Sequence, residues 1–276
     1  MKRRDILAFV TLAIVIGLIP NFVSSKYYFI VLNVIGLNAI VVIGLNLLIG
    51  YAGQISLGHA AFFGLGSYFS GVLTVNYGWS PWVAMLIGML ATGAVAYLVG
   101  YPSLKLRGHY LVMATLAFSI IVYILMGELS YFTGGHDGLI GIEPLSIFGY
   151  AFDSDLRNFY LIWFFVFICM ILSYNLLYSR VGRALRAIHG SEIASSSLGV
   201  NTQSYKVKIF VLSAMYASVS GSLYAHYIMF ISPSTYDFYY SIQVVTMVIV
   251  GGMGSLWGSI FGAALLTTIS EALHVA

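Results

Sequence analysis

Nine long apolar stretches follow one another along this 276-residue sequence, and they constrain its fold more than any other feature. A membrane-spanning helix needs about 20 consecutive, mostly apolar residues. The candidate spans are 6–24, 28–49, 56–76, 81–103, 109–127, 158–178, 208–230, 239–253 and 256–274. Only 8% of the residues are charged, against about 25% in an average soluble domain, so the chain cannot cover a water-facing surface. The sequence predicts an all-α, polytopic transmembrane bundle of about 8–10 helices.

Two of these stretches are unlike ordinary spans. The first follows "MKRRD" as a signal peptide would, but "IPNFVSSKYY" offers no small-residue cleavage site, so we expect a retained first helix. The stretch 50–66, "GYAGQISLGHAAFFGLG", is too polar and Gly-rich for a lipid-facing helix. We expect part of it to be a broken or re-entrant segment, surrounded by protein or by a water-filled cavity.

The charged residues predict an orientation. With the N-terminus inside, ten of the twelve Lys and Arg fall in inner loops: Lys2, Arg3, Arg4, Lys105, Arg107, Arg180, Arg183, Arg186, Lys206 and Lys208. Six of the nine acidic residues then fall outside: Glu128, Asp137, Glu143, Asp153, Asp155 and Asp237. The positive-inside rule therefore places the N-terminus in the cytoplasm. We expect one membrane domain over 1–276, with a main inner loop at about 179–207 and an outer loop at about 128–157.

The inner loop has the pattern of two short helices. Three arginines recur at three-residue spacing while apolar side chains fill another side: Arg180, Arg183 and Arg186, with Val181, Leu185 and Ile188. We expect Gly190 to end this helix in a left-handed conformation, Ser191 to cap a second helix, and Gly199 to end that one. The residues leave three interpretations open: a solvated loop that sets topology, a helix on the lipid surface, or a docking element for a partner.

Polar residues within the spans are candidates for a translocation path. Asn38 and Asn46 lie eight residues apart, near one face of a helix, and Gln54, Ser56 and His59 follow. Because asparagine is costly inside a membrane, these side chains either face a cavity or form hydrogen bonds between helices.

Other polar and small residues favour packing. Gly254, Gly258 and Gly262 form a G-x-x-x-G-x-x-x-G face, which predicts close helix packing. His59, His226 and Glu271 are the scarce ionisable groups of the spans, and we interpret them as packed or interfacial residues rather than a proton relay.

Motifs of several other function classes are missing. The sequence contains no H-E-x-x-H, no G-x-S-x-G and no P-loop, so we expect no hydrolytic enzyme and no ATPase. One cysteine, Cys169, excludes an internal disulfide, and we expect no metal site. A net charge of +3 is too small to indicate a nucleic-acid partner.

Five collinear blocks resemble a known family. They are "GLNLLIGYAGQISLGHAAFFGLGSY", "HYLVMATLAFSII", "FTGGHDGLIGI", "GRALRAIHGSEIASSSLGVNTQSYK" and "VIVGGMGSLWGSIFGA". They are similar to permease subunits of branched-chain amino acid ABC importers, in particular to the second permease type of those systems. The resemblance runs along almost the whole chain.

The resemblance implies a fold, partners and a role for the inner loop. It implies the ABC importer permease fold in a prokaryotic cell membrane, with a homologous permease, two cytoplasmic ATPases and an extracytoplasmic substrate-binding protein. This chain would bind no cofactor, because the ATPases use the ATP. The loop would form coupling helices that seat in an ATPase, with the coupling residues Gly182, Arg183, Arg186, Glu192, Ala194 and Gly199.

The sequence departs from the family pattern twice. In "EIASSS", serine stands where a second alanine is common, and the family continues beyond "LLTTISEAL" into a further span and a basic tail. The resemblance implies import of branched-chain or similar hydrophobic amino acids. Rival interpretations are an ABC permease for urea or short amides and an ion- or proton-coupled secondary carrier, with a membrane enzyme as the weakest.

Overall fold

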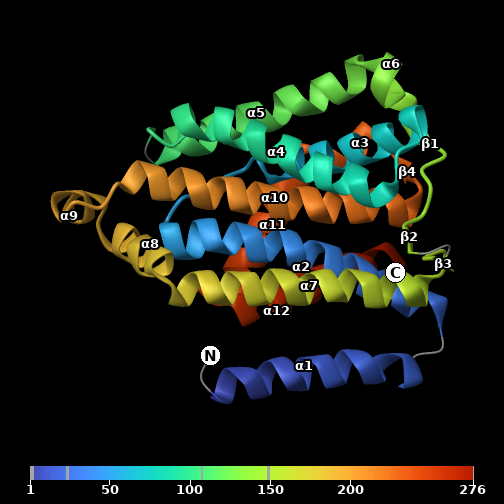
Figure 1. Ribbon diagram of the computed structural model, residues 1–276, viewed down its shortest axis with the longest axis horizontal. Helices are drawn as coiled ribbons and strands as arrows, with labels where there is room; N and C mark the ends of the chain where they lie inside the picture. The colour runs from blue at the N-terminus through green and yellow to red at the C-terminus, as the bar shows by residue number, and fades with distance from the viewer. Residues whose placement is uncertain (1–2, 23–24, 107, 148–149, 276) are drawn as a thin grey trace.

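The computed structural model describes residues 3–22, 25–106, 108–147 and 150–275 of the chain. Long helices lie side by side along its longest axis (Figure 1). In chain order the long helices are α1 (Arg3–Phe22), α2 (Lys26–Ala52), α3 (His59–Tyr77), α4 (Pro81–Ser103), α5 (His109–Glu128), α7 (Asp155–Tyr178), α10 (Thr202–Ile228), α11 (Phe238–Gly251) and α12 (Leu256–Val275).

The short elements gather at the two ends of the bundle. At one end lie α8 (Arg180–Gly190) and α9 (Glu192–Ser197), and we call this the α9 end. At the other end, called the strand end, lie α6 (Ser130–Thr133), η1 (Gly135–Asp137), β1 (Leu139–Ile140), β2 (Ser146–Ile147), β3 (Tyr150–Ala151), β4 (Phe230–Ile231) and η2 (Pro233–Tyr236). Two antiparallel pairs form there, β1 with β4 and β2 with β3. The predicted outer loop therefore folds against the segment between α10 and α11.

Each of the nine predicted apolar stretches coincides with a helix. Six of these helices are long and apolar enough to cross a membrane: α2, α4, α5, α7, α10 and α12. The 14 residues of α11 span only about 21 Å, less than the hydrocarbon core of about 30 Å. The all-α polytopic fold is thus confirmed. Lys2 and Arg107, which contribute to the predicted orientation, lie outside the described residues.

The chain breaks where the sequence predicts a broken segment. Helix α2 ends at Ala52, Gly53 takes a left-handed conformation (φ 67°), and its N–H donates to the carbonyl of Ile49 at 3.1 Å. Such a glycine satisfies the last carbonyls of a helix, which would otherwise lack partners. Residues 53–58 are non-helical, and α3 begins at His59 rather than at the predicted residue 56.

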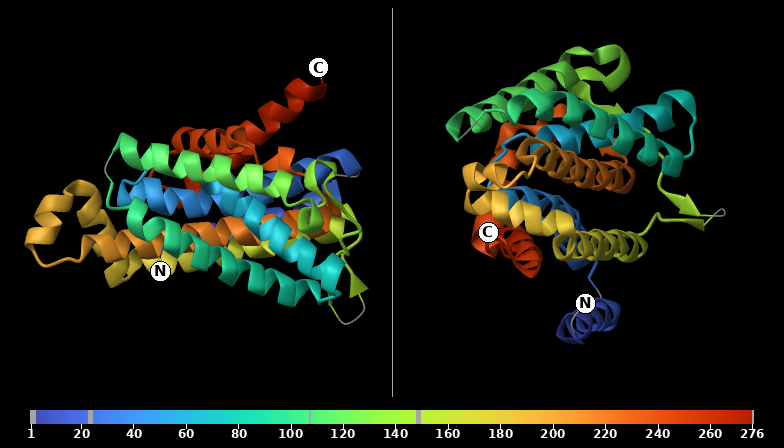
Figure 2. Two further views of the ribbon diagram at one scale, coloured as in Figure 1. Left: turned by 90° about the horizontal axis from the view of Figure 1, so that it is seen from above. Right: turned by 60° about the vertical axis from the view of Figure 1, so that its left-hand side comes forward.

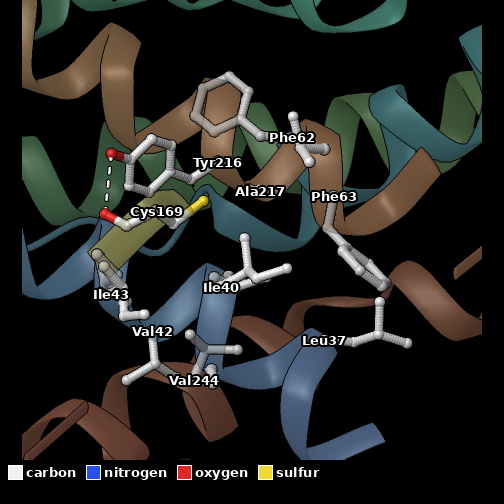
Figure 3. Close-up of a cluster of buried hydrophobic side chains, with 14 of the residues drawn as sticks. Leu37, Ile40, Val42, Ile43, Phe62, Phe63, Cys169, Tyr216, Ala217 and Val244 are labelled. Atoms are coloured by element: carbon white, nitrogen blue, oxygen red, sulfur yellow. Dashed lines mark hydrogen bonds between the residues drawn. The ribbon is translucent and has the colours of Figure 1, made fainter. Parts of the chain in front are cut away.

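The core lies around α2 and α10. Helix α10 packs against α2, α3 and α4, while α2 also packs against α7 and α12. Figure 3 shows their shared centre, where buried side chains of α2, α3, α7, α10 and α11 meet: Leu37, Ile40, Val42, Ile43, Phe62, Phe63, Cys169, Tyr216, Ala217 and Val244. Helix α1 lies at the edge, where the Phe9 ring packs 5.2 Å from that of Trp257.

Candidate functional site

The connection between α7 and α10 folds into the two predicted short helices. In Figure 1 and in the left panel of Figure 2, α9 projects past the ends of the long helices. The Ser179 Oγ accepts a hydrogen bond from the Val181 N–H at 3.1 Å, and the Ser191 Oγ accepts one from the Ala194 N–H at 3.2 Å, so each helix is capped.

One local prediction for this loop is wrong. Gly190 is the last residue of α8 and does not take a left-handed conformation. The bend lies at Ser191, whose extended backbone (φ −161°) and capping hydroxyl make it both the end of α8 and the start of α9. Because any residue adopts such an extended backbone, no glycine is required at the elbow.

The charged and apolar sides of α8 separate as the spacing predicts. Leu185 and Ile188 are buried against the bundle. The arginines face solvent: Arg180, Arg183 and Arg186. Positive charge therefore concentrates on the outer surface of the α9 end.

An ion pair ties α9 to α10. The Lys206 ammonium lies 2.8 Å from the Glu192 carboxylate, and the Lys206 side chain is only 2% exposed. The Thr202 hydroxyl donates to the same carboxylate oxygen at 3.4 Å. A charge buried this deeply is costly unless it is paired, so the pair fixes the orientation of α9 relative to α10.

Two of the predicted coupling residues are glycines for different reasons. A side chain on Gly182 would overlap the backbone of Leu177, so α8 can approach the end of α7 closely only with glycine there. Gly199 has open space around it, but its φ of +83° is a left-handed conformation that other residues adopt only with strain. Gly182 therefore sets how closely α8 approaches α7, and Gly199 follows the end of α9.

The tip of α9 exposes apolar side chains that the sequence analysis did not single out. Leu198 is 85% exposed and Ile193 is 69% exposed, with Ala194 exposed beside Ile193. The signal was present in the sequence, since these two large apolar residues flank a run of small polar ones in "EIASSSLG". An exposed apolar tip on a rigidly held helix is typical of a docking element.

The two asparagines of α2 that are candidates for the path, Asn38 and Asn46, are both used in contacts between helices. The Asn46 amide donates to the Ser259 hydroxyl and to the Ser255 carbonyl, each at 2.8 Å, and its oxygen accepts from the Gly254 N–H at 2.9 Å. Asn46 is fully buried by these contacts. Asn46 therefore forms hydrogen bonds between helices, which is one of the two roles that the sequence leaves open.

Asn38 lies in a polar cavity. Its amide donates to the Thr267 hydroxyl and its oxygen accepts from the Tyr240 hydroxyl, both at 3.0 Å. These residues line a cavity of about 210 Å³ between α2, α11 and α12, together with the polar side chains of Gln243, Ser270 and Glu271. Tyr240 and Gln243 were not predicted, because only the packing of α11 on α2 brings them to Asn38. Glu271, interpreted from the sequence as a packed or interfacial residue, lines the same cavity.

The other predicted path residues lie elsewhere. His59 is fully buried, with its Nε2 2.6 Å from the Ser213 hydroxyl, and Ser56 is buried beside the start of α3. Gln54 lines a separate cavity of about 240 Å³ near the α9 end, and Glu192 lines the same cavity. The five predicted residues are thus not brought together, and Asn38 alone reaches the polar cavity between α2 and α12.

The three glycines predicted to form one face divide between two contacts. A side chain on Gly258 would overlap the carbonyl of Gly251, and one on Gly262 would overlap that of Met247, so α11 and α12 touch through their backbones. Gly254 lies before α12 begins, in a turn (φ +79°) beside Gly50. It therefore belongs to the contact between this turn and α2, not to the helix face. Among the described residues, no three His, Cys, Asp or Glu side chains gather as a metal site would require.

Comparison with known proteins gives a consistent family. The family model described as "Branched-chain amino acid transport system / permease component" matches residues 27–276. The chain is 32% identical, over 236 residues, to the high-affinity branched-chain amino acid transport system permease protein LivM of Escherichia coli strain K12. That alignment covers 77% of this chain and 56% of LivM, so the chain spans little more than half the length of this relative.

Two further relatives match over a shorter stretch or at a lower identity. The permease protein LivH of the same strain is 35% identical over 116 residues, covering 42% of this chain and 37% of LivH. The ribose import permease protein RbsC of Escherichia coli K12 is 24% identical over 284 residues, covering 100% of this chain and 86% of RbsC. No solved structure matches the chain significantly.

Proposed function

The chain belongs to the family of branched-chain amino acid transport system permease components, and from this we propose that it is a permease subunit of an ATP-driven importer. Its solutes would be branched-chain or similar hydrophobic amino acids. Its family and its apolar helices make it a multi-pass membrane protein. Two ATPases that dock on the chain and on its homologous permease partner would hydrolyse the ATP, and this chain would bind none.

The observation that carries this proposal is the construction of the α9 end. Helix α9 projects beyond the bundle, exposes Ile193 and Leu198, and is fixed to α10 by the buried Lys206–Glu192 pair. A partner that binds the apolar tip of α9 can therefore displace α10, which packs against α2, α3 and α4. The exposed arginines of α8 would steer the partner rather than add much affinity, because exposed ion pairs contribute little.

The proposed orientation places the α9 end in the cytoplasm. The described basic side chains of this end include Lys105, Lys208 and the three arginines of α8, whereas Asp137, Asp153 and Asp237 lie at the strand end. By the positive-inside rule the strand end faces outward in a prokaryotic cell membrane, with the N-terminus in the cytoplasm. A substrate-binding protein would then dock on the strand end, where the 128–157 loop lies.

The polar cavity at Asn38 is the proposed contribution of this chain to the solute path. It combines amide, hydroxyl and carboxylate groups between helices of the bundle. The homologous permease would supply the other half of the path. Closure of the ATPases would move α9 and α10 together and change access to the path from one side to the other.

Co-purification tests the class of protein. The chain should be purified from its native membrane in mild detergent, and the partners identified by mass spectrometry. The double variant Ile193→Asp/Leu198→Asp should lose a stoichiometric ATPase and should lose ATP-dependent leucine uptake in vesicles. The matched control Ser196→Asp/Ser197→Asp places the same charges on α9 without removing its apolar tip, and should retain both. A chain that purifies alone and accumulates solute under an ion gradient would overturn the proposal.

Competition tests the solute. Leucine uptake by the reconstituted complex should be inhibited by valine and isoleucine, and not by urea, short amides or ribose. If urea alone inhibited uptake, the chain would still be proposed as an importer subunit, but with urea rather than amino acids as its solute.

A further inference from the structure

A surface groove of about 440 Å³ lies at the α9 end of the bundle and is lined by residues outside α8 and α9. It runs between the C-terminal end of α4 and the N-terminal end of α10, which pack side by side. Among the residues that line it are Tyr97, Tyr101, Gln203, Ser204, Lys208 and Val211. The Gln203 amide donates to the Tyr101 carbonyl at 3.2 Å, which holds the two helix ends together at the groove.

The groove lies where the lipid-facing surface of the bundle ends. Along α4, the strongly exposed side chains Leu90 (56%) and Leu98 (71%) precede Tyr101, and the exposed Lys105 follows the helix. Along α10 the exposed Lys208 comes first, and the partly exposed Val211 lies one turn further into the bundle. Tyrosine between apolar and basic surface is the pattern of a membrane–water interface.

Two lysines place positive charge at the groove: Lys208 lines it, and Lys105 lies beside it, over the ring of Tyr101. The Lys105 ammonium lies 5.0 Å from the centre of the Tyr101 ring, and that of Lys208 lies 5.9 Å from the centre of the Tyr205 ring. Within the described residues, no Asp or Glu lines the groove, and neither lysine forms an ion pair. The rings hold both ammonium groups at the interface, so an anion from the membrane can reach them.

We propose that this groove binds the headgroup of an anionic phospholipid. Lys208 and Lys105 neutralise the phosphate, the Ser204 hydroxyl is within the same groove as a further polar partner, and Tyr97 lies at the level of the glycerol backbone. One acyl chain then follows the apolar seam between α4 and α10. Basic pockets between helices on the cytoplasmic side are suited to such headgroups. This site rests on the proposed orientation, in which the α9 end faces the cytoplasm, and it does not depend on the transported solute.

Lipid retention tests the site directly. The chain is reconstituted in phosphatidylcholine nanodiscs with and without phosphatidylglycerol, and bound lipid is counted by native mass spectrometry after release. Lys208→Gln and Lys105→Gln should each lower the apparent affinity for phosphatidylglycerol by about five-fold, and high salt should weaken binding to the wild-type chain. Both lysines are exposed, so the variants should remain folded.

A matched control separates a site from general attraction. Lys26→Gln removes one exposed lysine at the opposite end of the bundle and should leave retention unchanged. Equal retention by the Lys105→Gln/Lys208→Gln double variant and the wild type would overturn the proposal, as would an equal loss in Lys26→Gln. Binding of inorganic phosphate to the chain, without any preference for phosphatidylglycerol over phosphatidylcholine, would also overturn the proposal. The groove would then bind a free anion rather than a lipid headgroup.

Discussion

Lys206 and Glu192 differ in how much water reaches them, and this difference predicts unequal mutant phenotypes. The Lys206 side chain is 2% exposed, whereas that of Glu192 is 25% exposed. Glu192→Gln leaves a buried ammonium without its counter-charge and should lower the free energy of unfolding by about 3 kcal/mol. Lys206→Met removes the buried charge and fills a similar volume, and the Glu192 carboxylate that remains can be hydrated. This substitution should therefore lower the free energy of unfolding by less than half as much as Glu192→Gln. Thermal and denaturant unfolding in detergent measure both.

The double variant decides whether the pair acts as one unit. Glu192→Gln/Lys206→Met should be about as stable as Lys206→Met alone, because the unpaired ammonium is gone. Additive losses would mean that each residue is stabilised by contacts other than this ion pair.

Gly199 offers a second test at the residue scale, with a control in the same loop. Gly199→Arg strains a left-handed backbone by about 1–2 kcal/mol and should displace α9, although space around the residue is open. Membrane insertion should be normal, whereas ATP hydrolysis should no longer drive uptake. Gly190→Arg adds the same side chain at an open position with ordinary helical backbone, so it should transport normally. Normal transport by Gly199→Arg would remove the coupling role proposed for this residue.

The polar residues of α2 mark the limit of prediction for single side chains. Asparagine in a span predicts either a helix contact or a cavity, and one sequence does not distinguish them. Asn46 is saturated by α12 and the turn before it, whereas Asn38 also borders the cavity. Glu271 lies 233 residues further along the chain from Asn38 and reaches the same cavity only through helix packing.

At the scale of elements, most of the fold follows from local signals. Apolar length predicts the long helices, and Ser191 and Gly199 predict where α9 begins and ends. The error at Gly190 is local, whereas the one at Gly254 arises from a tertiary contact, because the turn that contains Gly254 lies against Asn46 and Gly50. The exposed tip of α9 was overlooked because large apolar residues in such a chain are expected to be buried in helices or lipid.

Backbone contact between α11 and α12 predicts a strong effect of a small side chain. Gly258→Val would place methyl groups against the Gly251 carbonyl, which belongs to the backbone and cannot move aside. We expect separation of the two helices, with a stability loss of about 3 kcal/mol or more and little folded protein in detergent extracts. Gly17→Val on α1 adds the same side chain where nothing lies within 4 Å and should be tolerated. If Gly258→Val had the yield and melting temperature of the wild-type chain, the close backbone contact between α11 and α12 would be contradicted.

At the scale of the whole molecule, the two ends of the bundle carry side chains of opposite charge, and buried helices connect them. The α9 end carries exposed arginines and an apolar tip, while the strand end carries acidic side chains and two small strand pairs. Helices α2 and α10 run between these ends and are the most buried of the candidate spans among the described residues. In the proposed mechanism, movement imposed on α9 would be transmitted along α10 to the helices that border the Asn38 cavity, α2 and α3 among them.

This polarity predicts which end faces the cytoplasm. The sole cysteine of the chain, Cys169, is buried, so the wild-type chain should not react with a membrane-impermeant maleimide. Ser196→Cys places an exposed thiol on α9, and Ser234→Cys places one in η2 at the strand end. In intact cells, where only the outer surface is accessible, Ser234→Cys should be labelled and Ser196→Cys should not. After permeabilisation both should react. Labelling of Ser196→Cys in intact cells would invert the topology, and α9 would then lie where no cytoplasmic ATPase could reach it.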